Sequence, residues 1–427
     1  MSAPLPAFSA YGIELEYAIV DRKTLSIQPA ADELLSRMSG KLTSTVTNGA
    51  TGWSNELVLH QIELKNVIPN PSIESLLQAF QAEIRRANLI LESMDARLMP
   101  TAMHPWMNPD VETRLWPHDN AEIYSAYDQI FGCRSHGWAN LQSMHLNLPF
   151  ADDREFERLH AAVRMLLPIL PALAASSPIA EGGRSGFLDF RMKNYCTHQI
   201  KFPSTIGPVI PDTTPSPGAY TEEILAPMYR EIAALDTEGI LQYEWLNARG
   251  VVPRFDRSAL EIRVIDTQEC AQADLAIAEV VINIVHALYE EAYATLDEQQ
   301  AVSTEGLANI LQACTRDAEE AVIEDAGYLR LMGFPARCCE ARELWQHLIA
   351  PMRQHQPERP DHMGKIMDVI LQQGPLARRI LRALGPDWKR ERLKLVYGEL
   401  CDCLEEGRMF LGLSPSHAPH SSSLPRQ

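Results

Sequence analysis

The chain has 427 residues and a formal net charge of −18 at pH 7, from 38 lysines and arginines against 56 aspartates and glutamates. Hydrophobic residues make up 46 % of it, a content that favours a large folded core over disorder. The negative excess argues against a general nucleic-acid binder and against binding to anionic membranes. A small anionic ligand stays compatible with it, because a metal ion and a few arginines can reverse the field locally.

The cysteines and the N-terminal segment predict a cytoplasmic protein with reduced thiols. None of the eight cysteines forms a CxxC pair, which excludes a zinc ribbon of the usual spacing and disfavours a disulfide scaffold. The segment MSAPLPAFSAYGIELEY has neither the basic nor the long apolar region of a signal peptide. The most apolar stretch, Ala276–Leu288, is interrupted by Glu279, Asn283 and His286, so we expect no membrane span.

Alternation of apolar and polar residues predicts strands in the first two thirds of the chain. They are expected at Tyr11–Asp21, Asn55–Asn66, Gly137–Phe150 and Ser258–Thr267. Helical periodicity is found between them, at Ile73–Leu98 and Arg154–Ser176. The segment Glu181–Pro227 is rich in Gly, Pro and Thr and predicts a long loop, which in a folded protein is more often functional than idle.

The last third of the chain has helical periodicity throughout. Helices are expected at Ala271–Thr295, Glu305–Ala326, Cys339–Met352, Pro360–Gln373, Pro375–Leu384 and Trp388–Phe410. Strands in pairs with helices between them, followed by a helical region, predict an α+β fold with an antiparallel sheet. We expect one domain at 1–413, strand-rich over 11–270 and helical over 271–413, and a disordered tail at 414–427.

The polar face of each predicted strand carries charged or imidazole side chains at every second position. In chain order they are Glu14 and Glu16, Glu63, His145, and Glu261 with Arg263. Like charges at positions i and i+2 repel each other unless a cation lies between or in front of them. Carboxylates with one imidazole suit Mg²⁺ or Mn²⁺ better than zinc. The pattern therefore predicts a divalent-metal site, and such a face can seat a nucleotide triphosphate.

A plainer interpretation of the same pattern is a sheet with one solvated face. A solvated face normally carries Lys, Thr and Ser in quantity, whereas the outward residues here are mostly of metal-ligand types. The motifs GxxxxGK[ST], GxGxxG, HExxH and GxSxG are absent from the sequence. A nucleotide would therefore have to be held by metals and arginines.

Six segments in a fixed order carry a resemblance to a known family. They are GIELEY (12–17), QIELKN (61–66), MHP (103–105), QSMHLN (142–147), ALAASSPIAEGGRSGFLDFR (172–191) and ALEIRVIDT (259–267). Together they resemble the second type of glutamate–cysteine ligase, also called the carboxylate–amine ligase family, within the glutamine synthetase and guanido kinase superfamily. The resemblance implies a curved antiparallel sheet that forms a funnel backed by helices, in one catalytic domain.

The resemblance also implies a reaction and its residues. Members of the family use ATP to phosphorylate a carboxylate, typically the γ-carboxylate of glutamate, and an amine such as cysteine displaces the phosphate to give an amide. The motifs assign metal-ligand roles to Glu14, Glu16, Glu63, His145 and Glu261. Arg263 and Arg191 are the implied catalytic arginines that face the transferred phosphoryl group, and Arg184 is an implied phosphate or carboxylate contact.

Two other functions stay open from the sequence. One is phosphotransfer to a guanidino or carboxylate substrate, and the other is a non-catalytic paralogue that binds nucleotide or metal. The family's usual pair of histidines around a valine reads here Ser143-Met144-His145, which removes one ligand and leaves the number of metals open. We expect small-molecule acid and amine substrates with ATP and Mg²⁺ or Mn²⁺, no nucleic acid and no membrane, and a homo-oligomer as one option.

Overall fold

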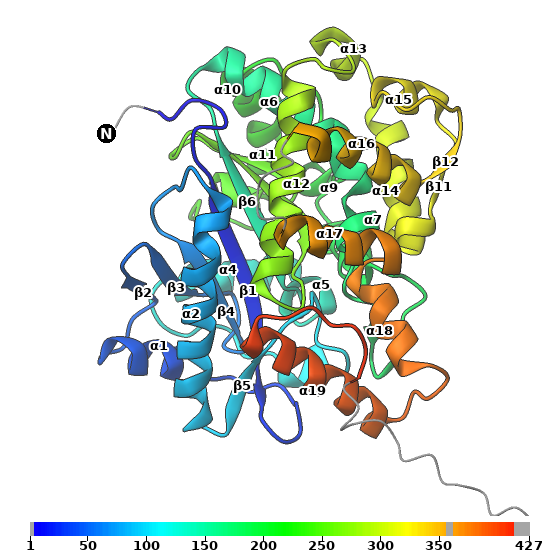
Figure 1. The fold of residues 1–427 in the computed structure, drawn as a ribbon. Coiled ribbons are helices and arrows are strands. Elements are labelled where there is room, and N and C mark those ends of the chain that lie inside the picture. The colour runs from blue at the N-terminus through cyan, green and yellow to red at the C-terminus, as the bar shows by residue number, and fades with distance from the viewer. Residues whose placement is uncertain (1–3, 356–361, 414–427) are drawn as a thin grey trace, which may run out of the picture.

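The computed structural model describes residues 4–355 and 362–413, and its centre is an antiparallel sheet of eight strands (Figure 1). In spatial order the strands are β2 (Thr45–Asn48), β3 (Thr51–Asn55), β4 (Gln61–Asn66), β1 (Gly12–Asp21), β6 (Ser143–Pro149), β10 (Ala259–Asp266) and β9 (Val251–Arg254), and β5 (Ala96–Met99) pairs with the end of β1. Within the described residues the sheet is open, with β2 and β9 at its edges. The predicted α+β class with an antiparallel sheet is confirmed.

Three long helices share one core with the apolar side of this sheet. They are α2 (Ile73–Glu92), α6 (Asp153–Leu166) and α12 (Ala271–Tyr289), and α12 packs against both of the others. By length and by its mean hydropathy of 1.4, α12 alone among the described helices could span a membrane, but 78 % of that window is buried inside the fold. In this protein α12 is therefore a core helix.

The C-terminal part of the chain is helical, as predicted (Figure 1, yellow to red). Its longer helices are α14 (Thr304–Asp317), α16 (Ala341–His355), α17 (His362–Gln373), α18 (Leu376–Leu384) and α19 (Arg390–Glu406). Two buried hydrogen bonds tie this part to the segment around α6: Tyr328 Oη donates to the Met165 carbonyl at 3.0 Å, and Trp345 Nε1 donates to the Ile169 carbonyl at 2.9 Å. α19 packs against α2 and β5.

The two faces of β1 follow the alternation in its sequence. Leu15 and Tyr17 are buried in the main core, whereas Glu14 and Glu16 lie on the opposite face. Further along the strand that opposite face becomes apolar, and Val20 belongs to a second buried cluster with α18 and α19. The C-terminal helices thus cover one end of the second face, and the polar end is left for a cavity.

Short elements connect these layers. They are α1 (Ala31–Ser39), α3 (Pro109–Glu112), α4 (Ala121–Phe131), α5 (His136–Ala139), η1 (Leu167–Ile169), α7 (Leu170–Ala174), β7 (Ile179–Ala180), β8 (Gly183–Arg184), α8 (Phe190–Tyr195), α9 (Pro203–Ile206), α10 (Pro217–Tyr220), η2 (Thr221–Leu225), α11 (Ala226–Ile232), η3 (Glu244–Leu246), α13 (Leu296–Gln300), η4 (Ala318–Glu320), β11 (Val322–Ile323), α15 (Ala326–Leu331) and β12 (Cys339–Glu340).

Several predicted boundaries were wrong. The helix expected at Ile73–Leu98 ends at Glu92, because the chain turns through Asp95 with φ of +52° and continues as β5. The strand expected at Gly137–Phe150 starts only at Ser143, after the short helix α5. The expected long loop at Glu181–Pro227 contains short helices as well. The predicted tail at 414–427 lies outside the described residues, and the single domain at 1–413 stays a prediction.

Candidate functional site

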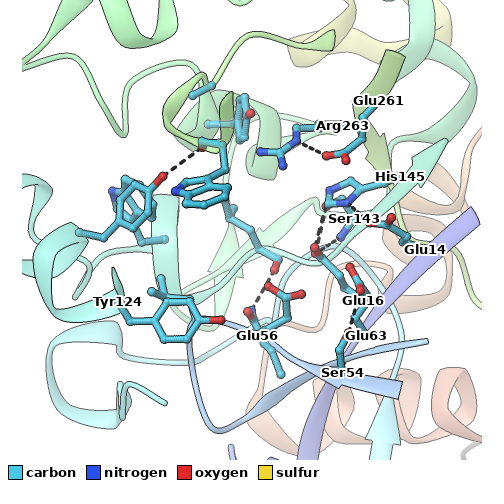
Figure 2. A pocket seen from close by; sticks show the side chains of 18 of the residues that line it. Glu14, Glu16, Ser54, Glu56, Glu63, Tyr124, Ser143, His145, Glu261 and Arg263 are labelled. Carbon is cyan, nitrogen blue, oxygen red and sulfur yellow. Dashed lines mark hydrogen bonds and ion pairs between the residues drawn. The ribbon is translucent and has the colours of Figure 1, made fainter. Parts of the chain in front are cut away.

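A cavity of about 630 Å³ opens at the polar end of the sheet (Figure 2). Seven of the eight residues singled out from the sequence line it, and six of them come from strands: Glu14, Glu16, Glu63, His145, Glu261 and Arg263. Arg191 lines it too, whereas Arg184 does not and is exposed on the β7–β8 hairpin. Four strands that are far apart in the sequence, β1, β4, β6 and β10, therefore supply one site.

Strand register places the acidic side chains next to one another. Glu16 of β1 lies opposite Glu63 of β4, and Glu14 lies opposite His145 of β6 on one side and Lys65 of β4 on the other. Residues that face each other across antiparallel strands have neighbouring Cβ atoms, so their charges interact strongly. The register therefore turns a pattern of single acids on separate strands into one cluster.

Two sets of ligand atoms in this cluster have the spacing of a metal site. Glu14, Glu63 and His145 form one set, and Glu16, Glu56 and Glu63 form the other, with all ligand atoms of a set within 4.8 Å of one another. Figure 2 shows these side chains gathered around one space, with Glu261 and Arg263 at its edge. Oxygen donors with a single imidazole are the chemistry of Mg²⁺ and Mn²⁺ sites.

Glu56 is the residue of this cluster that the sequence did not single out. It directly follows β3, in the connection between β3 and β4, and it lines the cavity. Its carboxylate has no hydrogen bond or ion pair with any described residue, although Asn55 beside it donates to Tyr124 Oη at 2.9 Å. The strand predicted at Asn55–Asn66 includes Glu56, but its alternation puts Glu56 on the face of Ile62 and Leu64. That prediction was wrong at its start: the strand begins only at Gln61, so alternation along it does not extend to Glu56.

Burial and neighbouring acids make ionisation of the Glu63 and Glu56 carboxyls unfavourable. Burial, with the charge of Glu14, raises the pKa of Glu63 to about 7 despite the nearby Lys65. Burial and the charges of Glu16 and Glu63 raise the pKa of Glu56 well above its usual range. Carboxylates that resist ionisation in this way are stabilised when a cation binds. The residues present therefore fit a divalent metal ion.

His145 and Lys65 neutralise the other side of the cluster. Burial would raise the pKa of Glu14, but the hydrogen bond from His145 Nδ1 at 3.1 Å and its charge lower it below its ordinary value. Burial would lower the pKa of His145, and its carboxylate neighbours, Glu14 first, raise it instead. Burial likewise opposes the charge on Lys65, but Glu63 and Glu14 raise its pKa. Both cations are thus held by the acids around them.

Ser143, at the position where the resemblance leads us to expect a histidine, anchors Glu16. Its backbone N–H and its hydroxyl donate to Glu16 Oε2 at 2.6 and 2.9 Å, and the hydroxyl also lies 3.0 Å from His145 Nε2. The other oxygen, Glu16 Oε1, lies 3.7 Å from His145 Nε2. Ser143 therefore orients a candidate metal ligand and is not itself in either set of ligand atoms.

Glu261 is bound by two arginines. Arg263 Nε donates to Glu261 Oε1 at 2.5 Å, and Arg254 Nη1 donates to Glu261 Oε2 at 2.8 Å. Burial would raise the pKa of Glu261, but these cations, Arg263 first, lower it. Glu261 lies outside both sets of metal-ligand atoms, so the geometry places it as the partner of the arginines. Its role as a metal ligand stays a prediction.

Arg263 lies in an irregular stretch of β10. The pairing of β10 with β6 shifts register between Ile262 and Ile265, and a bulge of this kind re-aims the side chains within it. Arg191, on α8, supports the same stretch from beneath: its Nη2 donates to the Arg263 carbonyl at 2.6 Å and its Nη1 to Asp266 Oδ1 at 3.3 Å. Only 1 % of Arg191 is exposed, so it holds β10 in place at the base of the cavity.

Aromatic side chains form the wall opposite the carboxylates. They are Tyr124, Tyr127, Trp138, Tyr195 and Trp245, together with His198. Tyr127 Oη donates to the Trp245 carbonyl at 3.0 Å, and the Trp245 ring stacks on Tyr243 with centroids 4.2 Å apart. Sequence patterns did not single out these aromatic residues over others, because they come from two connections between strands, β5 to β6 and β8 to β9.

The family model for glutamate–cysteine ligase family 2 matches residues 10–398, which includes every strand of this cavity. The chain belongs to glutamate–cysteine ligase family 2. An uncharacterised protein of Archaeoglobus fulgidus is 30 % identical over 401 residues, 94 % of this chain and 100 % of that protein. A putative glutamate–cysteine ligase of Rubrobacter xylanophilus is 25 % identical over 182 residues, 43 % of this chain and 47 % of that one.

Two solved structures of other proteins share this fold. A glutamate–cysteine ligase of Francisella tularensis in complex with AMP has a TM-score of 0.60 at 14 % identity, covering 92 % of this chain and 88 % of its own. A bifunctional glutathione synthetase of Pasteurella multocida has a TM-score of 0.52 at 14 % identity, covering 94 % and 52 %. Family membership supports a carboxylate–amine ligase of the glutamate–cysteine ligase type, and the two solved structures show the same fold.

Proposed function

We propose that this member of glutamate–cysteine ligase family 2 is a cytoplasmic, ATP-dependent carboxylate–amine ligase. It activates a carboxylate, with the γ-carboxylate of glutamate as the first candidate, as an acyl phosphate and forms an amide with an amine such as cysteine. The observation that carries the proposal is the single cavity in which the acids of β1 and β4, His145 of β6 and Arg263 of β10 meet. Its substrates are small molecules.

Different residues of the cavity supply the metal binding, the positive charge and the positioning that phosphoryl transfer needs. Glu16, Glu56 and Glu63 would hold Mg²⁺ or Mn²⁺, which when bound neutralises phosphate charge and orients the phosphates. Arg263 faces the cavity with Glu261 as its anchor, where its guanidinium can take up charge that develops on the transferred group. Arg191 fixes the backbone of Arg263. No covalent nucleophile is required, because positioning and charge neutralisation supply the catalysis.

The proposed reaction has two steps, formation of the acyl phosphate and displacement of phosphate by the amine. The acid oxygen bonds to the terminal phosphorus of ATP and ADP leaves. The amine nitrogen then attacks the acyl carbon, phosphate leaves, and a proton from the nitrogen is released. The products are therefore one amide, one ADP and one phosphate for each ATP consumed.

The test is an assay of ADP and phosphate release with ATP, a panel of amino-acid acids and a panel of amines, with and without Mg²⁺. We expect turnover that needs the metal, an acid and an amine together, and a rise in melting temperature with ATP and Mg²⁺. Glu63→Gln should lower turnover by about 100-fold or more, since one oxygen and its charge are lost from both sets of ligands. Exposed Glu33→Gln serves as the matched control.

Product analysis separates this function from its alternatives. A phosphotransferase would accumulate a phosphorylated guanidino or carboxylate product without free phosphate, and a non-catalytic paralogue would bind nucleotide without turnover. If no pair of acid and amine gives ADP, and ATP with Mg²⁺ leaves the melting temperature unchanged, the proposal is wrong.

A further inference from the structure

Lys65 introduces a positive charge into the middle of the acidic cluster. It lies on β4 two residues after Glu63, so both side chains leave the same face of the strand and both line the cavity. Its Nζ is 2.6 Å from Glu63 Oε1. Across the strand pair its register partner is Glu14. The ammonium therefore pairs with one residue of the first set of ligand atoms, and Lys65 lies opposite another in the strand register.

Both sets of ligand atoms depend on Glu63, which has only two carboxylate oxygens. Glu63 Oε1 already accepts from Lys65 Nζ and from Ser54 Oγ, the latter at 2.9 Å. Two divalent ions, one in each set, would have to share Glu63, most simply with one oxygen to each ion. With Lys65 in place, a single oxygen of Glu63 remains for a metal.

The two sets also differ in how far their charge is already balanced. In the first set, Glu14 is hydrogen-bonded to His145 at 3.1 Å and to Asn147 Nδ2 at 3.2 Å. In the second set, Glu16 has hydrogen bonds on Oε2 and its Oε1 lies 3.7 Å from His145 Nε2, whereas the Glu56 carboxylate has no ion-pair partner among the described residues. The carboxylate without a paired cation thus belongs to the second set, which consists of oxygen donors alone.

We propose that the Lys65 ammonium takes the place of one divalent cation in this cavity, so that the protein binds one Mg²⁺ or Mn²⁺, at Glu16, Glu56 and Glu63. The inference rests on the metal site of the proposed function and goes beyond it by fixing the number and place of the ions. A lysine cation at this point supplies one unit of charge that does not dissociate. Removing it leaves Glu14 and Glu63 free to bind a second ion with His145.

The experiment titrates Mn²⁺ into the metal-free protein and counts bound ions from the loss of the free Mn²⁺ signal in electron paramagnetic resonance. The wild type should bind one Mn²⁺ per chain. Lys65→Ser, which removes the charge and leaves room, should bind two and should melt at a lower temperature without metal. Lys65→Arg keeps the charge and should still bind one. Lys41→Ser removes the same unit of charge from an exposed position and should behave as wild type.

The outcomes separate this inference from the function it rests on. A wild type that turns over and binds two Mn²⁺, or a folded Lys65→Ser variant that still binds one, overturns the inference and leaves the ligase intact. A wild type that binds no Mn²⁺ and shows no turnover overturns the proposed function, and the inference with it. The metal-free melting temperature is a second readout: Lys65→Ser and wild type melting alike would contradict a charge-balancing role.

Discussion

Glu63 is the side chain that links the two sets of candidate metal-ligand atoms in this cavity. It is 5 % exposed, it belongs to both sets of ligand atoms, and one of its oxygens is bound by Ser54 and Lys65. The sequence marked Glu63 as an acid on a strand, which is correct. It could not show that Lys65 and Glu56 would reach it, because those contacts depend on rotamers and on the connection between β3 and β4.

Glu261 gives a prediction at the same scale. Glu261→Gln removes the charge that holds Arg263 and Arg254, so Arg263 loses its fixed position and turnover should fall by about 100-fold. The fold should stay intact, since Gln keeps the shape and two hydrogen-bonding groups. Steady-state kinetics and circular dichroism measure the two effects. Unchanged turnover would refute a role for Glu261 either as the arginine anchor or as a metal ligand.

The buried side chain of His160 should make the stability of the fold depend on pH. It is buried on α6 beside Phe156, and burial, followed by the charges of Arg164 and Arg249, lowers its pKa to about 3. An unfolded histidine takes up its proton near pH 6.5, so the fold loses stability as the pH falls from 6.5 toward 3. Between pH 7 and pH 5 this should amount to about 2 kcal/mol.

His160→Leu removes that titration and provides the comparison. Urea unfolding of both proteins at pH 7 and pH 5 should show the wild type losing about 2 kcal/mol more than the variant. Equal losses in the two proteins would mean that His160 is protonated in the folded state.

At the scale of elements, tight strand contacts explain why some residues of the motifs are needed. Gly12 opens the GIELEY segment and faces Asn147 of β6, and a Cβ at this position would lie 3.1 Å from the Asn147 Cβ. The close approach lets Asn147 reach Glu14. Glycine is therefore favoured at position 12 because the neighbouring strand leaves little room for a side chain. The backbone conformation of Gly12 does not itself require glycine.

A buried ion pair fixes the C-terminal helices to the end of the sheet. Arg379 of α18 forms two hydrogen bonds with Glu269, which follows β10, and its Nη1 donates to the Phe410 carbonyl at 2.8 Å. Both side chains are almost fully buried. Arg379→Leu leaves the Glu269 charge unpaired and should lower the free energy of unfolding by about 3–5 kcal/mol.

Arg382→Leu on the same helix is the control for this prediction. Arg382 is exposed and makes one hydrogen bond to the Gln373 carbonyl, so its loss should cost no more than about 0.5 kcal/mol. Thermal or urea unfolding measures both variants. Equal effects of the two changes would show that the buried pair does not anchor α18.

At the scale of the whole molecule, the strand-rich and helical parts share one core. Residues from β1 to α19 belong to the same main cluster of buried side chains. The hydrogen bonds of Tyr328 and Trp345 to carbonyls near the end of α6 cross between the two parts. The single domain predicted from the sequence is consistent with this packing.

Truncation tests that prediction. A fragment of residues 1–303 lacks α14 and the helices after it, which exposes apolar residues of α6, α7 and α12 that they cover. We expect the fragment to be insoluble or to lack a cooperative thermal transition, while the full chain melts in one. A soluble fragment with its own sharp transition would show that the helical part is a separate domain.

The sequence by itself determined the fold class, the helical C-terminal third and the polar faces of β1, β4, β6 and β10. These follow from alternation and periodicity, which are local properties of consecutive residues. It did not determine β2, β3, β5 or β9, which are too short to give a clear pattern, nor the bulge that aims Arg263.

Only the tertiary structure decided which charges meet. Strand register set Glu16 beside Glu63 and Lys65 beside Glu14, and the packing of β9 on β10 brought Arg254 to Glu261. The net charge of −18 argued against broad classes of partner, but it is a sum over the chain and does not say where the individual charges lie. Electrostatic interaction depends on distance and burial, so the number of metal ions in this cavity is a property of the fold.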